Sequence, residues 1–284
     1  MIDPTRHRWL SLRLKFSCFI SFSHGVLRVR YSLRYDKRAC LKDVVDYAAS
    51  KKVKVLIWVH SREVFTPQDR KAYFDTTIQA GAAGIEIDFP PKANVAWATW
   101  YTDTLRDAAD LKLLIDFHDA VKPTGRDRTW PNEITREGIR GQECNVTRYK
   151  RQLPPERDTI LPFNRFVQGY ADYMPTALNP KELLGFTWVH EIAKPIIFSS
   201  PFLCYADHPT FYLKNPALDI IKAIPATFDQ TVLLPGSKIG SAAAFARRSG
   251  DRWFVGILNG AEPQQMNIPL GVSGPRHLHH AKAH

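Results

Sequence analysis

The stretch that decides the fold runs from residue 53 to residue 119 and reads VKVLIWVHSREVFTPQDRKAYFDTTIQAGAAGIEIDFPPKANVAWATWYTDTLRDAADLKLLIDFHD. It contains three short, strand-like apolar runs, at residues 53–59, 85–89 and 112–117. Between these runs, the apolar side chains of residues 67–80 and 96–109 follow helical spacing. Short strands that alternate with helices of this length predict βα units and a parallel sheet.

Local signals at the helix ends support this alternation. Residues 41–50 have helical spacing and precede the first predicted strand. Thr66 is a suitable N-cap for the helix over residues 67–80, Asp69 lies in its first turn, and Gly81 follows its end. The sequence therefore predicts where these helices begin and end as well as their order.

Composition and charge exclude several classes of protein. With 284 residues, of which 44% are hydrophobic, the chain can form a core and is neither disordered, collagen-like nor a coiled coil. The net charge of +11 lies mainly at the ends, because residues 1–40 hold nine Lys and Arg against two acids and carry +7. Residues 271–284 carry another +2, which leaves about +2 for residues 41–270, so the charge does not indicate a nucleic acid partner.

Membrane and export signals are also weak. No window approaches the 18 apolar residues of a membrane span. Charged and polar residues interrupt the apolar stretch at 14–27, which therefore does not resemble a signal peptide. We expect no membrane partner.

Titratable residues stand where the predicted strands end: His60, Asp88, and the pair His118 and Asp119. In βα folds the chemistry lies at the carboxyl ends of the strands. Asp88 interrupts the apolar run at 85–89, so burial of its charge requires a hydrogen-bonding or ionic partner. We therefore expect an active site at this edge. Nucleotide-binding, zinc-protease and serine-hydrolase motifs are absent from the sequence.

The segment 118–143, HDAVKPTGRDRTWPNEITREGIRGQE, mixes carboxylates with basic residues and turn formers. Pro123, Gly125 and Pro131 indicate a structured loop rather than a plain helix. Glu137 and Glu143 flank two glycines, where backbone can approach a ligand closely. A solvated charged loop is the simpler interpretation, but the interleaved aromatic and carboxylate groups favour a polar site.

Three motifs in this segment, 118-HDAVKPTG-125, 128-RTWPN-132 and 137-EGIRGQE-143, resemble glycoside hydrolase family 97, whose members are bacterial α-glucosidases and α-galactosidases. The strand 84-GIEIDF-89 looks like the nucleophile strand of that family, and 171-ADYMPT-176 and 198-FSSP-201 look like later family segments. The resemblance covers about residues 41–270. Several ungapped motifs in the right order make it more specific than any one of them.

The resemblance implies an α/β fold, with a partial (β/α)8 TIM barrel over residues 41–228 and the start of a small C-terminal β domain over residues 229–270. Strand-like runs at 241–246 and 253–258 fit that second domain. Residues 1–40 are unassigned and do not look like family sequence, and residues 271–284 are an unassigned tail. The N-terminal β-sandwich of the family and its first barrel strands have no counterpart, so the chain is expected to be a fragment.

The resemblance also implies roles for individual residues. Asp88 matches the nucleophile of the retaining branch, and Glu143 matches the acid/base that protonates the leaving oxygen and later activates water. The family depends on calcium, for which Glu137 and Glu143 match ligands and Asp119 is a further candidate. His118 matches a substrate-contacting position, and Trp130 offers a face for sugar stacking.

The resemblance therefore implies a calcium-dependent, retaining hydrolase of terminal α-galactosides, acting on an oligosaccharide or α-galactoside. An α-glucosidase of the same family and a truncated, inactive fragment are the alternatives. A basic binding protein is a third reading, which rests on the net charge alone.

Overall fold

The computed structural model describes residues 22–23, 26–30, 38–90, 94–145 and 152–268. The chain divides into two compact units. Unit 1 comprises Met1–Val121 and Arg126–Arg136, and unit 2 comprises Lys122–Gly125 and Glu137–His284. Each unit is described by itself below.

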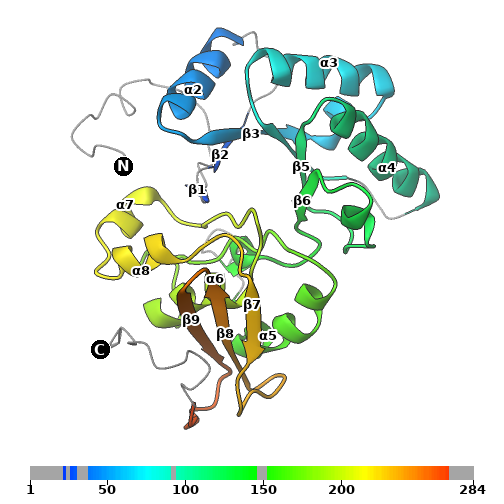
Figure 1. Cartoon of the computed structure of the whole chain (residues 1–284). Coiled ribbons are helices and arrows are strands. Elements are labelled where there is room, and N and C mark those ends of the chain that lie inside the picture. The colour runs from blue at the N-terminus through cyan, green and yellow to red at the C-terminus, as the bar shows by residue number, and fades with distance from the viewer. Residues whose placement is uncertain (1–21, 24–25, 31–37, 91–93, 146–151, 269–284) are drawn as a thin grey trace. The chain divides into compact units, whose positions relative to one another are not determined.

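Unit 1 is built on one six-stranded sheet whose spatial order equals its order along the chain (Figure 1). Its strands are β1 (Phe22–Ser23), β2 (Val26–Arg30), β3 (Lys54–His60), β4 (Gly84–Asp88), β5 (Leu114–Phe117) and β6 (Glu133–Arg136). β1 runs antiparallel to β2, and every later pair is parallel. The parallel sheet expected from the alternating pattern is confirmed.

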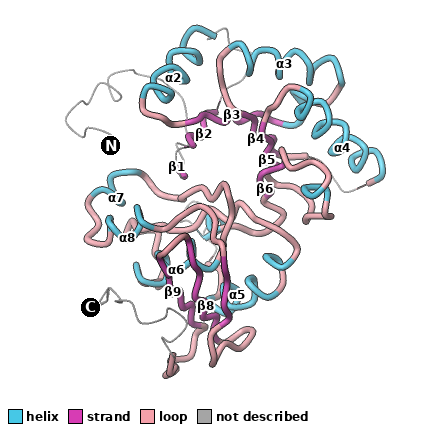
Figure 2. Tube along the Cα trace, in the orientation of Figure 1, coloured by secondary structure: helices cyan, strands magenta, loops and turns pink. Residues whose placement is uncertain are grey.

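Helices connect successive parallel strands and lie on one side of this sheet (Figure 2). They are α2 (Arg38–Ser50), α3 (Pro67–Gln79) and α4 (Val95–Asp110). Thr66 caps α3 as predicted, since its side chain accepts a hydrogen bond from the Asp69 N–H. Asn94 caps α4 in the same way, by accepting from the Trp97 N–H.

Each strand of this sheet divides its side chains between two faces. On β3, β4 and β5 the odd-numbered residues are apolar and enter the core of unit 1, with helix residues such as Tyr73, Phe74 and Leu105. Full burial of an aliphatic or aromatic side chain stabilises the fold by about 1.5–3 kcal/mol. The even-numbered positions near the strand ends carry Trp58, Glu86 and Asp116, so the opposite face is polar.

The segment 118–143, expected to be a structured loop, contains the strand β6. The two charged side chains of β6 are buried rather than solvated, and Arg136 Nε donates to Glu133 Oε1 at 2.5 Å. The Arg136 guanidinium also lies over the rings of Tyr101 and Phe117, at 4.8 and 5.1 Å from their centroids. A charge-rich sequence therefore forms a strand because its charges pair with each other and with aromatic rings.

The sheet also extends into the segment that sequence analysis left unassigned. β2 pairs with β3 in parallel, from Val26 opposite Lys54 to Arg30 opposite Trp58. Helix α2 begins at Arg38, ahead of the predicted start at residue 41. Four parallel strands therefore precede the charged segment, where the sequence indicated three.

Unit 2 combines short helices with a separate three-stranded antiparallel sheet of order β7-β8-β9. The strands are β7 (Gln230–Leu233), β8 (Ala242–Ser249) and β9 (Arg252–Asn259). The helices are α5 (Pro155–Ile160), α6 (Trp188–Ile197), α7 (Pro209–Leu213) and α8 (Leu218–Ala223). The predicted strands at 241–246 and 253–258 correspond to β8 and β9.

Single-turn 3₁₀ helices complete the two units: η1 (Ser61–Val64), η2 (Arg126–Arg128), η3 (Gln142–Asn145), η5 (Leu161–Phe163) and η6 (Arg165–Val167). Over the part of the chain that is described, no helix combines the length and apolar character needed to cross a membrane.

Candidate active site

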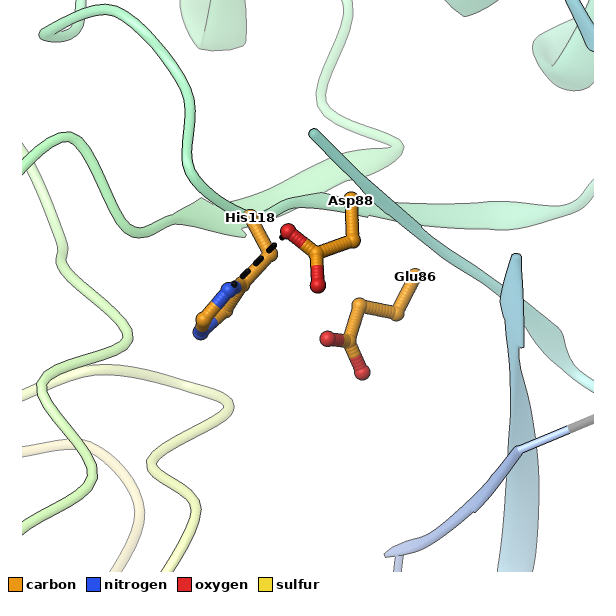
Figure 3. Close-up of side chains that lie close together, drawn as sticks. All are labelled: Glu86, Asp88 and His118. Atoms are coloured by element: carbon orange, nitrogen blue, oxygen red, sulfur yellow. Dashed lines mark ion pairs between the residues drawn. The ribbon is translucent and has the colours of Figure 1, made fainter. Parts of the chain in front are cut away.

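The carboxyl ends of β3, β4 and β5 bring polar side chains together in unit 1. His60 lies opposite Asp88 in the register of β3 and β4. The His118 N–H donates to the Ile87 carbonyl at 2.9 Å, which places His118 beside the end of β4. Figure 3 shows Glu86, Asp88 and His118 converging on one space. The predicted edge therefore carries a cluster of titratable groups.

Asp88 is 6% exposed, and both of its carboxylate oxygens have partners. Oδ1 accepts a hydrogen bond from the Phe89 N–H at 2.7 Å and lies 3.4 Å from His118 Nδ1. Oδ2 accepts from the Trp58 indole Nε1–H at 3.0 Å. The partner that the buried charge of Asp88 requires is thus supplied from two neighbouring strands.

These contacts decide the charge of Asp88. Burial by itself raises the pKa of this carboxyl group, because water no longer solvates the charged form. The hydrogen bond and charge of His118, together with the hydrogen bonds from Trp58 and Phe89, outweigh burial and lower the pKa below its ordinary value. Asp88 is therefore an ionised carboxylate at neutral pH.

The backbone immediately after two of the site residues is in the left-handed region. Phe89 has φ of 58° and Asp119 has φ of 45°, which are unusual for residues other than glycine. The Ser61 hydroxyl holds the first of these turns by donating to the Phe89 carbonyl at 2.7 Å. Such strain concentrates at functional sites, where the surrounding structure maintains it.

The remaining predicted residues of unit 1 have different surroundings. Asp119 is exposed, and partial burial and the charge of Asp88 raise its pKa. His60 accepts a hydrogen bond from the Arg62 N–H through Nδ1 and so caps η1. Trp130 is half-buried and packs against the apolar core of unit 1. Its role in sugar stacking stays a prediction.

Glu86, Asp88 and His118 form a group able to hold a metal ion, since each offers one ligand atom and these atoms lie within 4.8 Å of one another. A set with an imidazole nitrogen suits a transition metal better than calcium, which prefers oxygen ligands. Sequence analysis missed Glu86 and Trp58. The alternation of apolar and polar residues in 85-IEIDF-89 was the available signal, because it marks a strand with one polar face.

Glu137 and Glu143 belong to unit 2. Glu137 is 6% exposed, and Glu143 is half-buried at the start of η3. A carboxylate oxygen of each lies within 4.8 Å of the other. Two like charges this close favour a cation between them, and carboxylate oxygens are ligands that calcium accepts. These two residues therefore fit the donor chemistry expected of a calcium site.

Buried side chains of unit 2 hold the segment that carries these glutamates. Gln142, next to Glu143, accepts a hydrogen bond from Lys194 Nζ at 2.8 Å and donates to Glu191 Oε1 at 3.3 Å. Gly141 packs so closely that a Cβ atom would lie 2.7 Å from the Tyr173 carbonyl oxygen. Nothing in the local sequence pattern pointed to Lys194 or Glu191.

Comparisons with known proteins agree with this architecture. The family described as Glycoside hydrolase 97 matches residues 31–139, and the one described as Glycosyl-hydrolase 97 C-terminal, oligomerisation, matches residues 227–282. A protein of Streptomyces bingchenggensis named "Probable retaining alpha-galactosidase" is 32% identical over 232 residues, which are 81% of this chain and 35% of that protein. A retaining alpha-galactosidase of Bacteroides thetaiotaomicron is 28% identical over 257 residues, 86% of this chain and 38% of that protein.

Solved structures share the fold. A crystal structure of a beta-arabinopyranosidase matches 86% of this chain and 43% of its own, with a TM-score of 0.75 and 23% identity. A family 97 enzyme from Pseudoalteromonas sp. strain K8 in complex with panose matches 80% of this chain and 39% of its own, with a TM-score of 0.69 and 23% identity.

The parallel sheet with helices on one side has the architecture of a partial (β/α)8 barrel, and the antiparallel sheet is separate from it. The chain belongs to glycoside hydrolase family 97. It spans about a third of the length of the curated relatives it matches.

Proposed function

We propose that the protein is a retaining glycoside hydrolase that cleaves terminal α-galactosides and uses calcium. The observation that carries the proposal is Asp88, a buried and ionised carboxylate at the carboxyl end of β4. The two curated relatives are both named as retaining alpha-galactosidases, which favours galactose. As part of the same proposal, Asp88 is the nucleophile, as its match to the retaining branch of the family predicts.

The proposed reaction has two displacements. In the first, a carboxylate oxygen of Asp88 attacks the anomeric carbon, the glycosidic bond breaks, and Glu143 gives its proton to the leaving oxygen. In the second, Glu143 removes a proton from water, the water oxygen attacks the same carbon, and Asp88 departs as a carboxylate. Two inversions at one carbon give net retention. A low pKa suits Asp88, because the nucleophile must be charged when the sugar arrives.

We assign the calcium ligands to Glu137, Glu143 and Asp119. The proximity of their carboxylates supports the assignment of Glu137 and Glu143. The assignment of Asp119 rests on the resemblance to the family alone. A bound calcium ion supplies positive charge beside these carboxylates and accepts oxygen ligands from a sugar. His118, which faces Asp88, is assigned to substrate contact, and Trp130 to sugar stacking.

The proposed partners are an oligosaccharide or a simple α-galactoside. The Pseudoalteromonas enzyme has been solved with panose and with acarbose, so an α-glucoside is the alternative substrate. Residues 227–282 match a domain described as serving oligomerisation, and we propose that this part of unit 2 contacts a second copy of the chain.

The test is a nucleophile replacement with chemical rescue. We expect Asp88→Ala to lose more than about 99% of its turnover of an aryl α-galactoside, since covalent catalysis is removed. Added azide should restore turnover and yield a β-galactosyl azide, because azide attacks in place of the missing carboxylate. The Asp75→Ala variant is the control, as Asp75 lies on the exposed face of α3 in a surface ion pair.

Substrate choice and stereochemistry are read in the same assay. NMR of the wild-type product should show the α-anomer of galactose first. Unchanged turnover by the Asp88→Ala variant would contradict the nucleophile assignment, and first release of the β-anomer would contradict retention. Faster turnover of the aryl α-glucoside would favour the alternative substrate.

A further inference from the structure

We propose that Trp58 is a positioning residue for the nucleophile. Its indole N–H holds the carboxylate of Asp88 in the orientation in which Oδ2 is the attacking oxygen. The inference rests on the proposed function and adds to it a residue and an atom. Trp58 lies on β3, in register with Glu86 and two residues before His60. It is half-buried and lies on the polar face of the strand.

The two oxygens of Asp88 differ in how many donors they face. A carboxylate oxygen has two lone-pair directions. Oδ1 faces the Phe89 N–H at 2.7 Å and His118 Nδ1 at 3.4 Å, so both directions are used. Oδ2 faces the Trp58 indole at 3.0 Å, and no second donor to it is found among the described residues. One lone pair of Oδ2 is therefore left for a bond to carbon.

Figure 3 shows the same asymmetry. One oxygen of Asp88 lies toward His118 along the dashed line, and the other points away from the imidazole into the space shared with Glu86. An attacking oxygen must face an open space, because the anomeric carbon approaches along its lone pair. Oδ2 lies on the side that faces Glu86, whereas Oδ1 is turned toward the histidine and the backbone.

Trp58 also makes contacts other than the one to Asp88. Its backbone carbonyl accepts from the Tyr73 hydroxyl at 3.4 Å, and its ring meets Phe89 edge-on with centroids 6.4 Å apart. Rotation of the Asp88 carboxylate would break the indole contact and the Phe89 contact together. The indole thus limits the carboxylate to one orientation before the sugar binds. Because this orientation is already set, less of the activation barrier of the attack remains to be overcome.

Kinetics of Trp58→Phe test the role, because this change keeps an aromatic ring and removes the N–H donor. We expect kcat/KM for an aryl α-galactoside to fall about tenfold to a hundredfold, the range for a hydrogen bond to a charged group. We expect kcat to take most of the loss and KM to change little. Trp100→Phe is the matched control, since its indole donates at 3.3 Å to the Val64 carbonyl within the core.

A double-mutant cycle separates positioning from general damage. If Trp58 acts through Asp88, Trp58→Phe should leave the azide-rescued rate of Asp88→Ala unchanged, because azide has replaced the oriented carboxylate. An equal loss in both backgrounds would overturn the proposal. So would a Trp58→Phe variant with wild-type kcat/KM.

A spectroscopic measurement tests the contact without any turnover. The chain has seven tryptophans, and the indole N–H resonance missing from ¹⁵N-labelled Trp58→Phe identifies that of Trp58. We expect Asp88→Ala to shift this resonance upfield and Asp75→Ala to leave it in place. An unmoved resonance would overturn the contact. If Asp88→Ala shifts the Trp58 resonance but the wild-type chain has no turnover, the contact stands and the proposed function is contradicted. The two failures are therefore distinguishable.

Discussion

At the scale of single residues, the molecule depends on buried charges whose partners are fixed by packing. Asp158 in unit 2 is 2% exposed; its Oδ2 lies 3.2 Å from Lys194 Nζ and 3.0 Å from His190 Nε2. Its Oδ1 accepts from the Tyr173 hydroxyl at 2.7 Å. Burial opposes the charge, but Lys194, His190 and Tyr173 outweigh it and lower the pKa of Asp158 well below its ordinary value.

This lowered pKa predicts a pH dependence of stability. A carboxyl group with a lower pKa in the folded state stabilises the fold above its unfolded pKa of about 3.9, and that contribution is lost as the pH falls below this value. We expect Asp158→Asn to lower the free energy of unfolding at pH 7 by about 3–5 kcal/mol, because Lys194 loses a buried partner. We also expect a shallower fall in stability between about pH 5 and pH 3.

Thermal unfolding at a series of pH values measures both effects. Asp75→Asn serves as control, because its ion pair with Lys71 lies on the surface and should change stability by less than about 1 kcal/mol. Parallel pH curves for wild type and Asp158→Asn would show that this carboxyl group does not have the lowered pKa.

At the scale of elements, one arginine ties together the backbone that follows β6. The Arg165 guanidinium is buried and donates to four carbonyl oxygens at 3.0–3.1 Å. They belong to Glu137, Gly138, Gly169 and Tyr170. The carbonyls of Glu137 and Gly138, at the start of the predicted ligand segment, thus share one side chain as their donor.

Removal of this donor should loosen the segment. We expect Arg165→Met to lower the free energy of unfolding by about 3 kcal/mol, because one buried and three partly buried carbonyls lose a charged donor. Amide exchange over residues 137–143 should become faster. Lysine should not restore stability, since it lacks the planar arrangement of donors.

Chemical denaturation and hydrogen exchange are the measurements. Arg106→Met is the matched control, as Arg106 forms surface ion pairs with Asp103 and Asp107. Equal exchange rates over residues 137–143 in Arg165→Met and wild type would contradict the role given to Arg165.

Sequence reasoning was strongest for elements with a local period and weakest where charges are buried. The spacing in residues 67–80 and the Thr66 cap predicted α3 correctly, because both signals lie within a few residues. β6 escaped prediction, since Glu133 and Arg136 are charged and only their mutual pairing makes a buried strand possible. β2 was also missed, because its segment is rich in basic residues.

At the scale of the whole molecule, two compact units share the sequence motifs of one family. The proposed nucleophile lies in unit 1, and the close pair of glutamates lies in unit 2. The net charge of +11 has no part in either site, since it comes mainly from residues 1–40 and 271–284.

Calcium should therefore stabilise the folded chain through unit 2, whether or not a substrate is present. We expect saturating CaCl₂ to raise Tm by several degrees, because a ligand at about 100 times its Kd adds about 2.7 kcal/mol to the stability of the state that binds it. EDTA should reverse the shift, and Glu137→Gln should abolish it.

Glu262→Gln provides the control for the loss of one carboxylate, since Glu262 is exposed in the segment after β9. An equal calcium shift in Glu137→Gln and wild type would contradict the ligand assignment.

The sequence by itself determined the alternation of strands and helices over residues 41–117, the Thr66 cap and the family, because period, capping residues and ungapped motifs are all local. It also singled out Asp88, which interrupts an apolar run at the end of a predicted strand. Only the tertiary structure decided what surrounds that carboxylate. Trp58, Asp88 and His118 lie 30 residues apart along the chain and meet because three parallel strands share one register. Register depends on pairing between distant segments, and no single segment of sequence contains it.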